Sequence, residues 1–282
     1  MSDINCRMPA VALRGLVCLP DMILHFDVSR KKSIAALEAA MVKDQMVFLV
    51  AQKDPDEEDP KQEDLYTAGA MAKVKQIVKM PENMVRVVAE GKFRAELDEM
   101  ISVSPYLLTD VIIHDREEKV ENENEAEAMR RVLEEIVQKF IDAGAKFGPE
   151  ITRQMEQAED IVKLTNQLCA NMPMRWQDRQ TLAEKMDFRE RYEELCRIME
   201  KEYDVLLINQ DIQNKVKSRL EKNQRDYVLR EQMKLIREEL GDDMQSEIDE
   251  YEKKLEELKA PDVVKEKLEK EISRFKASAG NS

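Results

Sequence analysis

Histidine and cysteine are the residue types that most often bind metals or take part in covalent catalysis, and this chain has few of either. Its two histidines, His25 and His114, belong to no HExxH motif and lie beside no cysteine pair. Its cysteines are too widely spaced for a zinc motif or a disulfide framework; they are Cys6, Cys18, Cys169 and Cys196. The spacing predicts no metal site and four reduced thiols.

Motifs for nucleotide binding and for nucleophilic catalysis are missing from these 282 residues. A P-loop needs GxxxxGK[ST], because its backbone amides surround the phosphates and its lysine reaches them. Of the seven glycines only Gly144 and Gly148 lie close together, and no Gly-Lys pair follows them. There is no GxSxG motif either, and no nucleophile and base stand out. The sequence predicts no catalytic and no cofactor-binding residue in this stretch.

Composition and charge limit the partners further. The formal net charge is -14, and such a surface repels nucleic-acid phosphates. No run of about 18 apolar residues occurs, and the first eight residues lack the apolar core of a signal peptide. We therefore expect neither nucleic-acid binding nor membrane insertion, and a cytoplasmic location.

The elements that would position any site fall into two classes along the chain. Up to about residue 115, short Val-, Ile- and Leu-rich segments alternate with Pro, Gly and Asp clusters, which is typical of strands. These expected strands cover 11–17, 46–52, 70–80, 85–89 and 107–113. One helix is expected after Ser33 as N-cap, and residues 79–84 are expected to form a hairpin turn. The pattern predicts a small, mostly antiparallel, barrel-like domain at 1–116.

Beyond an acidic linker the spacing of apolar residues becomes helical. Asp187 and Glu190 have the spacing of a capping box at the start of one helix. Residues 117–202 are predicted to form a bundle, and 203–241 a long projecting helix with a thin apolar stripe that ends at Gly241. Residues 242–282 are expected to form a helical hairpin and a linker. The fold class is thus α+β.

Two stretches resemble Lon-type ATP-dependent proteases of the bacterial LonA type. One joins LRGLVCLP at 13–20 to KSIAALEAAM at 32–41, and the other is LEKNQRDYVLREQMKLIREELG at 220–241. LVAQKDP at 49–55, DLY at 64–66 and GKFR at 91–94 follow in the family's order. Tyr227-Val228 stands where the family commonly has Tyr-Tyr.

The resemblance implies a PUA-like pseudo-barrel that binds substrate, followed by a helical bundle and a long helical arm. It further implies that a homohexameric ATPase using ATP and magnesium and a Ser-Lys endopeptidase domain belong to the whole protein, which degrades misfolded and regulatory proteins. Neither domain is recognisable in these residues. We expect the present chain to be monomeric or weakly associating, since its apolar seam is narrow.

Unfolded or damaged proteins are the partners that the resemblance implies. A receptor for such segments should offer adaptable apolar surface, and methionine is suited to it, although most of the 17 methionines are expected to fill cores or helices. We predict substrate contacts from apolar residues in turns, where packing does not explain them: Pro20, Met22, Ile23 and Met84.

Two other interpretations stay open from the sequence. A free-standing Lon-like adaptor would lack the ATPase and would usually carry an added zinc module, for which this chain has no ligands. A coiled-coil scaffold would explain residues 203–275 but not the strand-rich first third.

Overall fold

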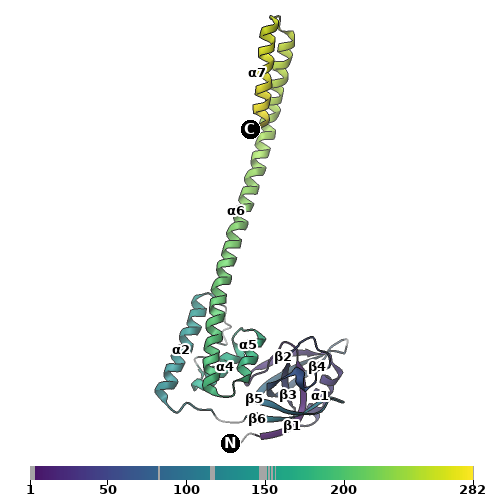
Figure 1. The fold of residues 1–282 in the computed structure, drawn as a ribbon, viewed down its shortest axis with the longest axis vertical. Helices are drawn as coiled ribbons and strands as arrows, with labels where there is room; N and C mark the ends of the chain where they lie inside the picture. The colour runs from purple at the N-terminus through teal and green to yellow at the C-terminus, as the bar shows by residue number, and fades with distance from the viewer. Residues whose placement is uncertain are drawn as a thin grey trace. The chain divides into compact units, whose positions relative to one another are not determined.

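The structure is a computed structural model that describes residues 4–81, 83–114, 118–145 and 157–281, with single positions 151, 153 and 155. At 237, 238, 240–246 and 277–281 it describes the backbone alone. The chain divides into two compact units, Met1–Ile208 and Asn209–Ser282. Figure 1 labels the helices and strands of both.

Six strands of the first unit form one mixed sheet. Their order is β2-β5-β4-β3-β1-β6, and β5 also pairs with β6. β1 runs parallel to β3, while the other pairings are antiparallel. The strands are β1 (Ile4–Leu13), β2 (Ile23–Val28), β3 (Met46–Gln52), β4 (Leu65–Lys79), β5 (Val85–Ser102) and β6 (Leu107–His114).

The long strand β5 makes the sheet curl. Its first part pairs with β4, and its part from Arg94 to Ser102 pairs with β6. Register shifts in the β4–β5 and β5–β6 ladders are the irregularities that let a sheet bend. Small and branched side chains such as Val47, Ala70 and Val87 fill the inside. This mostly antiparallel, curled sheet, followed by helices, confirms the predicted α+β class with an amino-terminal pseudo-barrel.

Two expectations for the first strands are wrong. β1 covers Ile4–Leu13 and not 11–17, because Gly15 adopts a left-handed backbone conformation (φ 62°) that turns the chain after Arg14. β2 was not predicted at all, and Ile23 is its first residue and not part of a turn. Its signal is a strict alternation of exposed and buried side chains over only six residues.

The helix that packs on this sheet begins earlier than predicted. α1 (Lys31–Val42) has Arg30 in the N-cap position, with no side-chain cap, so Ser33 is not the N-cap. Ser33 is buried together with Ala36, Leu37 and Ala40. Burial of this face, and not a capping hydroxyl, determines where the helix starts.

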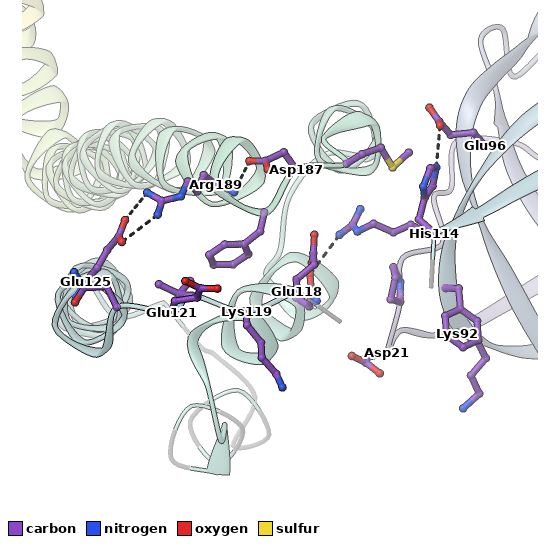
Figure 2. Close-up of a pocket in the computed structure, with 18 residues that line it drawn as sticks. Asp21, Lys92, Glu96, His114, Glu118, Lys119, Glu121, Glu125, Asp187 and Arg189 are labelled. Carbon is purple, nitrogen blue, oxygen red and sulfur yellow. Dashed lines mark hydrogen bonds and ion pairs between the residues drawn. The ribbon is translucent and has the colours of Figure 1, made fainter. Parts of the chain in front are cut away.

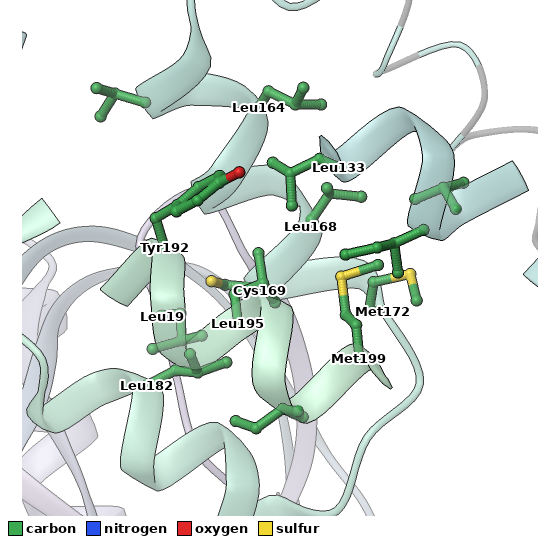
Figure 3. Close-up of a cluster of buried hydrophobic side chains, with 14 of the residues drawn as sticks. Leu19, Leu133, Leu164, Leu168, Cys169, Met172, Leu182, Tyr192, Leu195 and Met199 are labelled. Atoms are coloured by element: carbon green, nitrogen blue, oxygen red, sulfur yellow. The ribbon is translucent and has the colours of Figure 1, made fainter. Parts of the chain in front are cut away.

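The helices that follow in the described part of the first unit are α2 (Glu123–Asp142), α4 (Ile161–Asn171), α5 (Trp176–Glu184) and the beginning of α6 (Phe188–Glu257). Side chains of Asn122 and Asp160 cap α2 and α4. Leu133, Leu164 and Leu195, all fully buried, belong to the core between the helices (Figure 3). The same core includes Leu19 from the sheet region, so sheet and helices share apolar packing.

Polar contacts also join the sheet to the helices. The Gln180 amide donates to the Ala68 carbonyl at 3.1 Å, and the Arg94 guanidinium donates to the Leu182 carbonyl at 3.2 Å. The ring of Tyr66 meets Trp176 edge-on at 6.4 Å between centroids. The described residues up to 208 therefore pack as one body, in which β4 lies against α5 and Arg94 of β5 bonds to the same helix.

The predicted start and end of the long helix are wrong. α6 begins at Phe188, where the Asp187 carboxylate accepts from the amides of Arg189 and Glu190 at 2.9 and 3.2 Å. It continues through Gly241 to Glu257. One interior glycine costs only about 1 kcal/mol relative to alanine, which neighbouring helix formers such as Glu and Lys offset. The four-part division at 116, 202 and 241 stays a prediction.

In the second unit, α7 (Asp262–Asn281) folds back alongside the last part of α6 as a hairpin (Figure 1). The predicted break at Ala260-Pro261 is confirmed, and Lys276 pairs with Glu252 at 2.6 Å. α7 runs helically through 277–281, where a linker was expected, because alanine there favours helix. Ile212, Val216 and Leu220 are each more than half exposed.

Among the residues described here, no helix has the length and apolar character needed to cross a membrane. Within the same residues no group of three or more His, Cys, Asp or Glu side chains is arranged to hold a metal ion.

Candidate functional site

A cavity of about 1020 Å³ lies in the first unit, between the sheet and the helices (Figure 2). Strand β5 and the turn before β2 form one side, and residues 118–122, the start of α2 and the start of α6 form the other. Its lining is Pro20, Asp21, Lys92, Phe93, Arg94, Glu96, His114, Glu118, Lys119, Val120, Glu121, Asn122, Glu125, Asn166, Met186, Asp187, Phe188 and Arg189.

The lining combines apolar side chains with a surplus of carboxylates. Six acidic side chains face four basic ones. Three of the acids are already paired: Glu125 binds Arg189 through both oxygens, Glu96 meets His114 at 2.9 Å, and Glu118 is ion-paired with Arg191. Such a cavity suits apolar and cationic side chains and disfavours anions.

Two buried arginines hold the walls of this cavity in place. Arg94 is 7% exposed and donates to the Leu182 carbonyl and, at 3.4 Å, to the Asn166 side chain. Burial, and secondly the charge of Arg191, lowers the pKa of Arg94 to about 10, so the guanidinium stays protonated at pH 7. Arg191 is fully buried and ion-paired with Glu118. These charges are used in internal bonds, so their role is to position the wall.

The turn before β2 places three of the four predicted contact residues together. Pro20 lines the cavity. Met22 is half-buried and packs against both the helical core and the core inside the sheet. Ile23 is 64% exposed and pairs with Glu90 of β5. Apolar side chains therefore continue from the wall of the cavity to the edge strand of the sheet.

Close backbone contact with β5 fixes this turn. The Asp21 amide donates to the Gly91 carbonyl at 3.0 Å, and the Gly91 amide donates to the Met22 carbonyl at 2.9 Å. A Cβ atom on Gly91 would lie 2.0 Å from the Leu19 carbonyl oxygen. Only glycine allows this approach, so Gly91 determines where Pro20 to Ile23 lie.

Met84, the fourth predicted residue, lies elsewhere. It sits in the β4–β5 turn, where its carbonyl accepts from the Met80 amide at 2.8 Å. Ile23 pairs with Glu90, six residues further along β5, so Met84 is roughly 20 Å from Ile23 along the strand. The structure does not bring Met84 to the other three, and the binding role of all four stays a prediction.

Sequence reasoning missed the other apolar residues that line the cavity. Phe93, Val120, Met186 and Phe188 come from three separate segments. Phe93 lies in β5 and Phe188 begins α6, while Val120 and Met186 lie in connecting segments, so only the packing of the helical part against the sheet brings them together.

Comparisons with known proteins identify the family of this chain. The family described as "ATP-dependent protease La (LON) substrate-binding domain" matches residues 7–201. A Lon protease of Lachnoclostridium phytofermentans is 43% identical over 283 residues, covering 100% of this chain and 35% of the relative. A Lon protease of Brevibacillus choshinensis is 38% identical, covering 98% of this chain and 35% of the relative. The chain thus spans about a third of the length of these relatives.

A solved structure shows the same fold at low sequence identity. It is the "N terminal domain of Mycobacterium avium complex Lon protease", with a TM-score of 0.53 and 16% identity. The match covers 69% of this chain and 98% of that structure.

Proposed function

Because this chain belongs to the substrate-binding domain family of the Lon protease, we propose that it captures exposed apolar segments of unfolded or damaged proteins at Pro20, Met22 and Ile23. Met84 would provide a second, separate contact. In the whole protein, the captured chain would pass to an ATP-dependent Ser-Lys endopeptidase.

The observation that carries this proposal is the apolar turn beside the large cavity. Ile23 keeps 64% of its surface exposed although it begins a strand, and Met22 has a flexible side chain that can adapt to different partners. The cavity next to it is lined by apolar side chains and by more carboxylates than basic groups. Such a surface binds apolar and basic side chains without requiring one sequence.

ATP and magnesium would bind outside these residues. A nucleotide site needs backbone amides of a glycine-rich loop and a lysine that reaches the phosphates. The 282 residues have no Gly-Lys-Ser or Gly-Lys-Thr sequence, so they do not fit ATP. The hexamer would likewise depend on other parts of the whole protein, with the exposed stripe of Ile212, Val216 and Leu220 adding weak contacts. Four free thiols suit the reducing cytoplasm.

Binding of a permanently unfolded protein, reduced and carboxymethylated α-lactalbumin, tests the proposal. Replacing Met22 and Ile23 together by serine should weaken binding about five- to thirtyfold, because burial of such side chains contributes roughly 1–2 kcal/mol when they are only partly exposed beforehand. Fluorescence anisotropy of the labelled protein measures the dissociation constant.

A matched control removes an exposed apolar side chain elsewhere. Val42→Ser on α1 changes a residue that is 89% exposed and distant in sequence from the turn, and it should leave binding unchanged. Met84→Ser is measured separately because of its location. If serine at all three positions 22, 23 and 84 leaves binding at the wild-type level, the proposed contact surface is wrong.

A further inference from the structure

Strand β2 is the edge of the sheet, and its free side has the chemistry of a binding site for an extended chain. β2 is last in the strand order and pairs only with β5. The inference developed from this edge rests on the proposed function, because it specifies how an unfolded segment is held.

The register shows which backbone groups of β2 point away from β5. The Gly91 amide donates to the Met22 carbonyl, so the carbonyl of Met22 points toward β5. In an antiparallel ladder every second residue directs both its N–H and its C=O to the partner strand. Leu24, Phe26 and Val28 therefore bond to β5, while the groups of the residues between them point outward: Ile23, His25 and Asp27.

These outward groups are free in the described part of the chain. No backbone or side-chain hydrogen bond joins the amides or carbonyls of Ile23, His25 and Asp27 to any described residue outside the β2–β5 ladder. The three residues are exposed, as the alternating pattern of β2 shows. Three donors and three acceptors are thus available, in the spacing of a strand.

Proteins usually protect such an edge, and β2 lacks the common means. Lysine, proline and bulges on an edge strand prevent pairing with other chains. The sequence ILHFDV has no lysine and no proline, and the β2–β5 register has no shift. The one acid, Asp27, binds Arg86 through both oxygens at 2.8 and 3.0 Å, and Arg86 holds the pKa of Asp27 below its ordinary value.

A small cavity beside β2 would give the bound strand a place for one side chain. Its volume is about 90 Å³, and Phe26 and Val28 line it together with Leu13 and Leu16. Arg14 and Arg30 lie at its rim, where the Glu57 carbonyl accepts from both. In recognition by strand addition, main-chain bonds give affinity and such pockets select alternate side chains.

The charge of this corner of the sheet indicates which segments fit best. The stretches 23–28, 73–79 and 85–92 carry five basic side chains against two acidic ones, in a chain whose net charge is -14. An added strand with an apolar side chain for the small cavity and acidic side chains near it would complement this corner.

We propose that the free edge of β2 binds an extended segment of an unfolded protein as an additional antiparallel or parallel strand. The amides and carbonyls of Ile23, His25 and Asp27 form the new ladder, and the cavity at Phe26 and Val28 takes one apolar side chain. Because the bonds are to main-chain groups, many sequences can bind in the same way.

The first experiment removes one outward donor while keeping the ladder to β5. In His25→Pro the missing N–H is the one that points away from β5, and proline is tolerated at such edge positions. His25→Ala is the matched control, because it shortens the side chain and keeps the N–H. Binding of carboxymethylated α-lactalbumin should weaken about tenfold in His25→Pro and stay at the wild-type level in His25→Ala. Equal affinities of the two variants would overturn the proposal.

A ligand-side experiment covers the case in which His25→Pro disturbs the fold. A nine-residue peptide of α-lactalbumin that binds the wild-type chain is methylated at one backbone nitrogen at a time. Strand addition predicts that methylation weakens binding at every second position and leaves it unchanged between them. Uniform tolerance along the peptide would refute the edge as the site, while serine at 22 and 23 could still weaken binding and so support the proposed function. Absence of any binding by the wild-type chain would overturn both.

Discussion

Gly91→Ala is the substitution with the clearest structural consequence for the proposed contact surface. The new Cβ would lie 2.0 Å from the Leu19 oxygen and 2.8 Å from its carbonyl carbon, and both atoms belong to the backbone. The turn must therefore move away, which breaks the two hydrogen bonds that Gly91 makes with Asp21 and Met22. Two such bonds contribute about 1–3 kcal/mol, and the overpacking adds a similar amount. The expected loss is roughly 2–5 kcal/mol.

Urea unfolding followed by the fluorescence of Trp176, the only tryptophan of the chain, measures this loss in the first unit. With a slope of about 2 kcal/mol per molar, the midpoint should fall by roughly 1–2.5 M. Below the transition, binding of carboxymethylated α-lactalbumin per folded molecule should also weaken, because the turn carrying Met22 and Ile23 has moved. An unchanged midpoint would show that the approach of Leu19 to β5 is not as close as described.

Substitutions at two other glycines distinguish displacement of the turn from general destabilisation of the fold. Gly69→Ala would place its Cβ 2.5 Å from the Leu49 oxygen, so it should destabilise the sheet without moving the turn, and binding per folded molecule should persist. Gly144 has φ 75° and nothing within 4 Å, so Gly144→Ala should cost only the strain of a left-handed alanine, about 1–2 kcal/mol. If Gly69→Ala weakens binding as much as Gly91→Ala, the effect is general destabilisation and the reasoning about the turn fails.

Two further predictions concern the thiols and the state of association. Burial raises the pKa of Cys18 to about 12 and of Cys169 to about 11 from the ordinary 9, so both should resist Ellman's reagent at pH 8 in the native chain while half-exposed Cys6 reacts. Because the folded state keeps these thiols protonated, their contribution to the free energy of unfolding is complete below pH 9 and is lost above it. Urea midpoints should therefore fall as the pH rises from about 9 to 11, and constant midpoints would contradict the burial of the thiols. Sedimentation velocity of the 282-residue chain should show a monomer or a weak, concentration-dependent oligomer, and a tight hexamer would overturn that expectation.

The sequence predicts the parts of the fold whose apolar pattern is long or strongly branched. The strand at 46–52 has the expected bounds and β6 differs by one residue, whereas β4 begins at Leu65 rather than 70 and β5 runs to Ser102, well past the expected end at 89. β2 is missed because six residues between polar neighbours give a weak pattern, and its partner β5 lies about 60 residues away. The helix end expected at Gly241 is wrong because the free-energy cost of one glycine is small beside the helix propensity of the many residues around it.

The candidate site is predictable only in part. Pro20, Met22 and Ile23 are neighbours in sequence, so their proximity follows at once. The distance to Met84 depends on the β2–β5 register, which sequence patterns do not give. The meeting of Phe93 and Phe188 in the cavity depends on how the helices pack on the sheet, and Gly91 has no local signal apart from its lack of a side chain.

The position of β1 between β3 and β6 has a consequence for the order of folding during synthesis. β1 leaves the ribosome long before β6, since its antiparallel partner begins at Leu107 and the Arg7–Asp110 ion pair joins residues 103 positions apart. At about 5–20 residues per second, roughly 5–20 s pass before β6 exists. Until then residues 4–10 of β1 lack their antiparallel partner, and such non-local pairing slows folding and exposes the nascent chain to aggregation. The domain that we propose binds unfolded chains is thus itself incompletely folded during the first seconds of its synthesis.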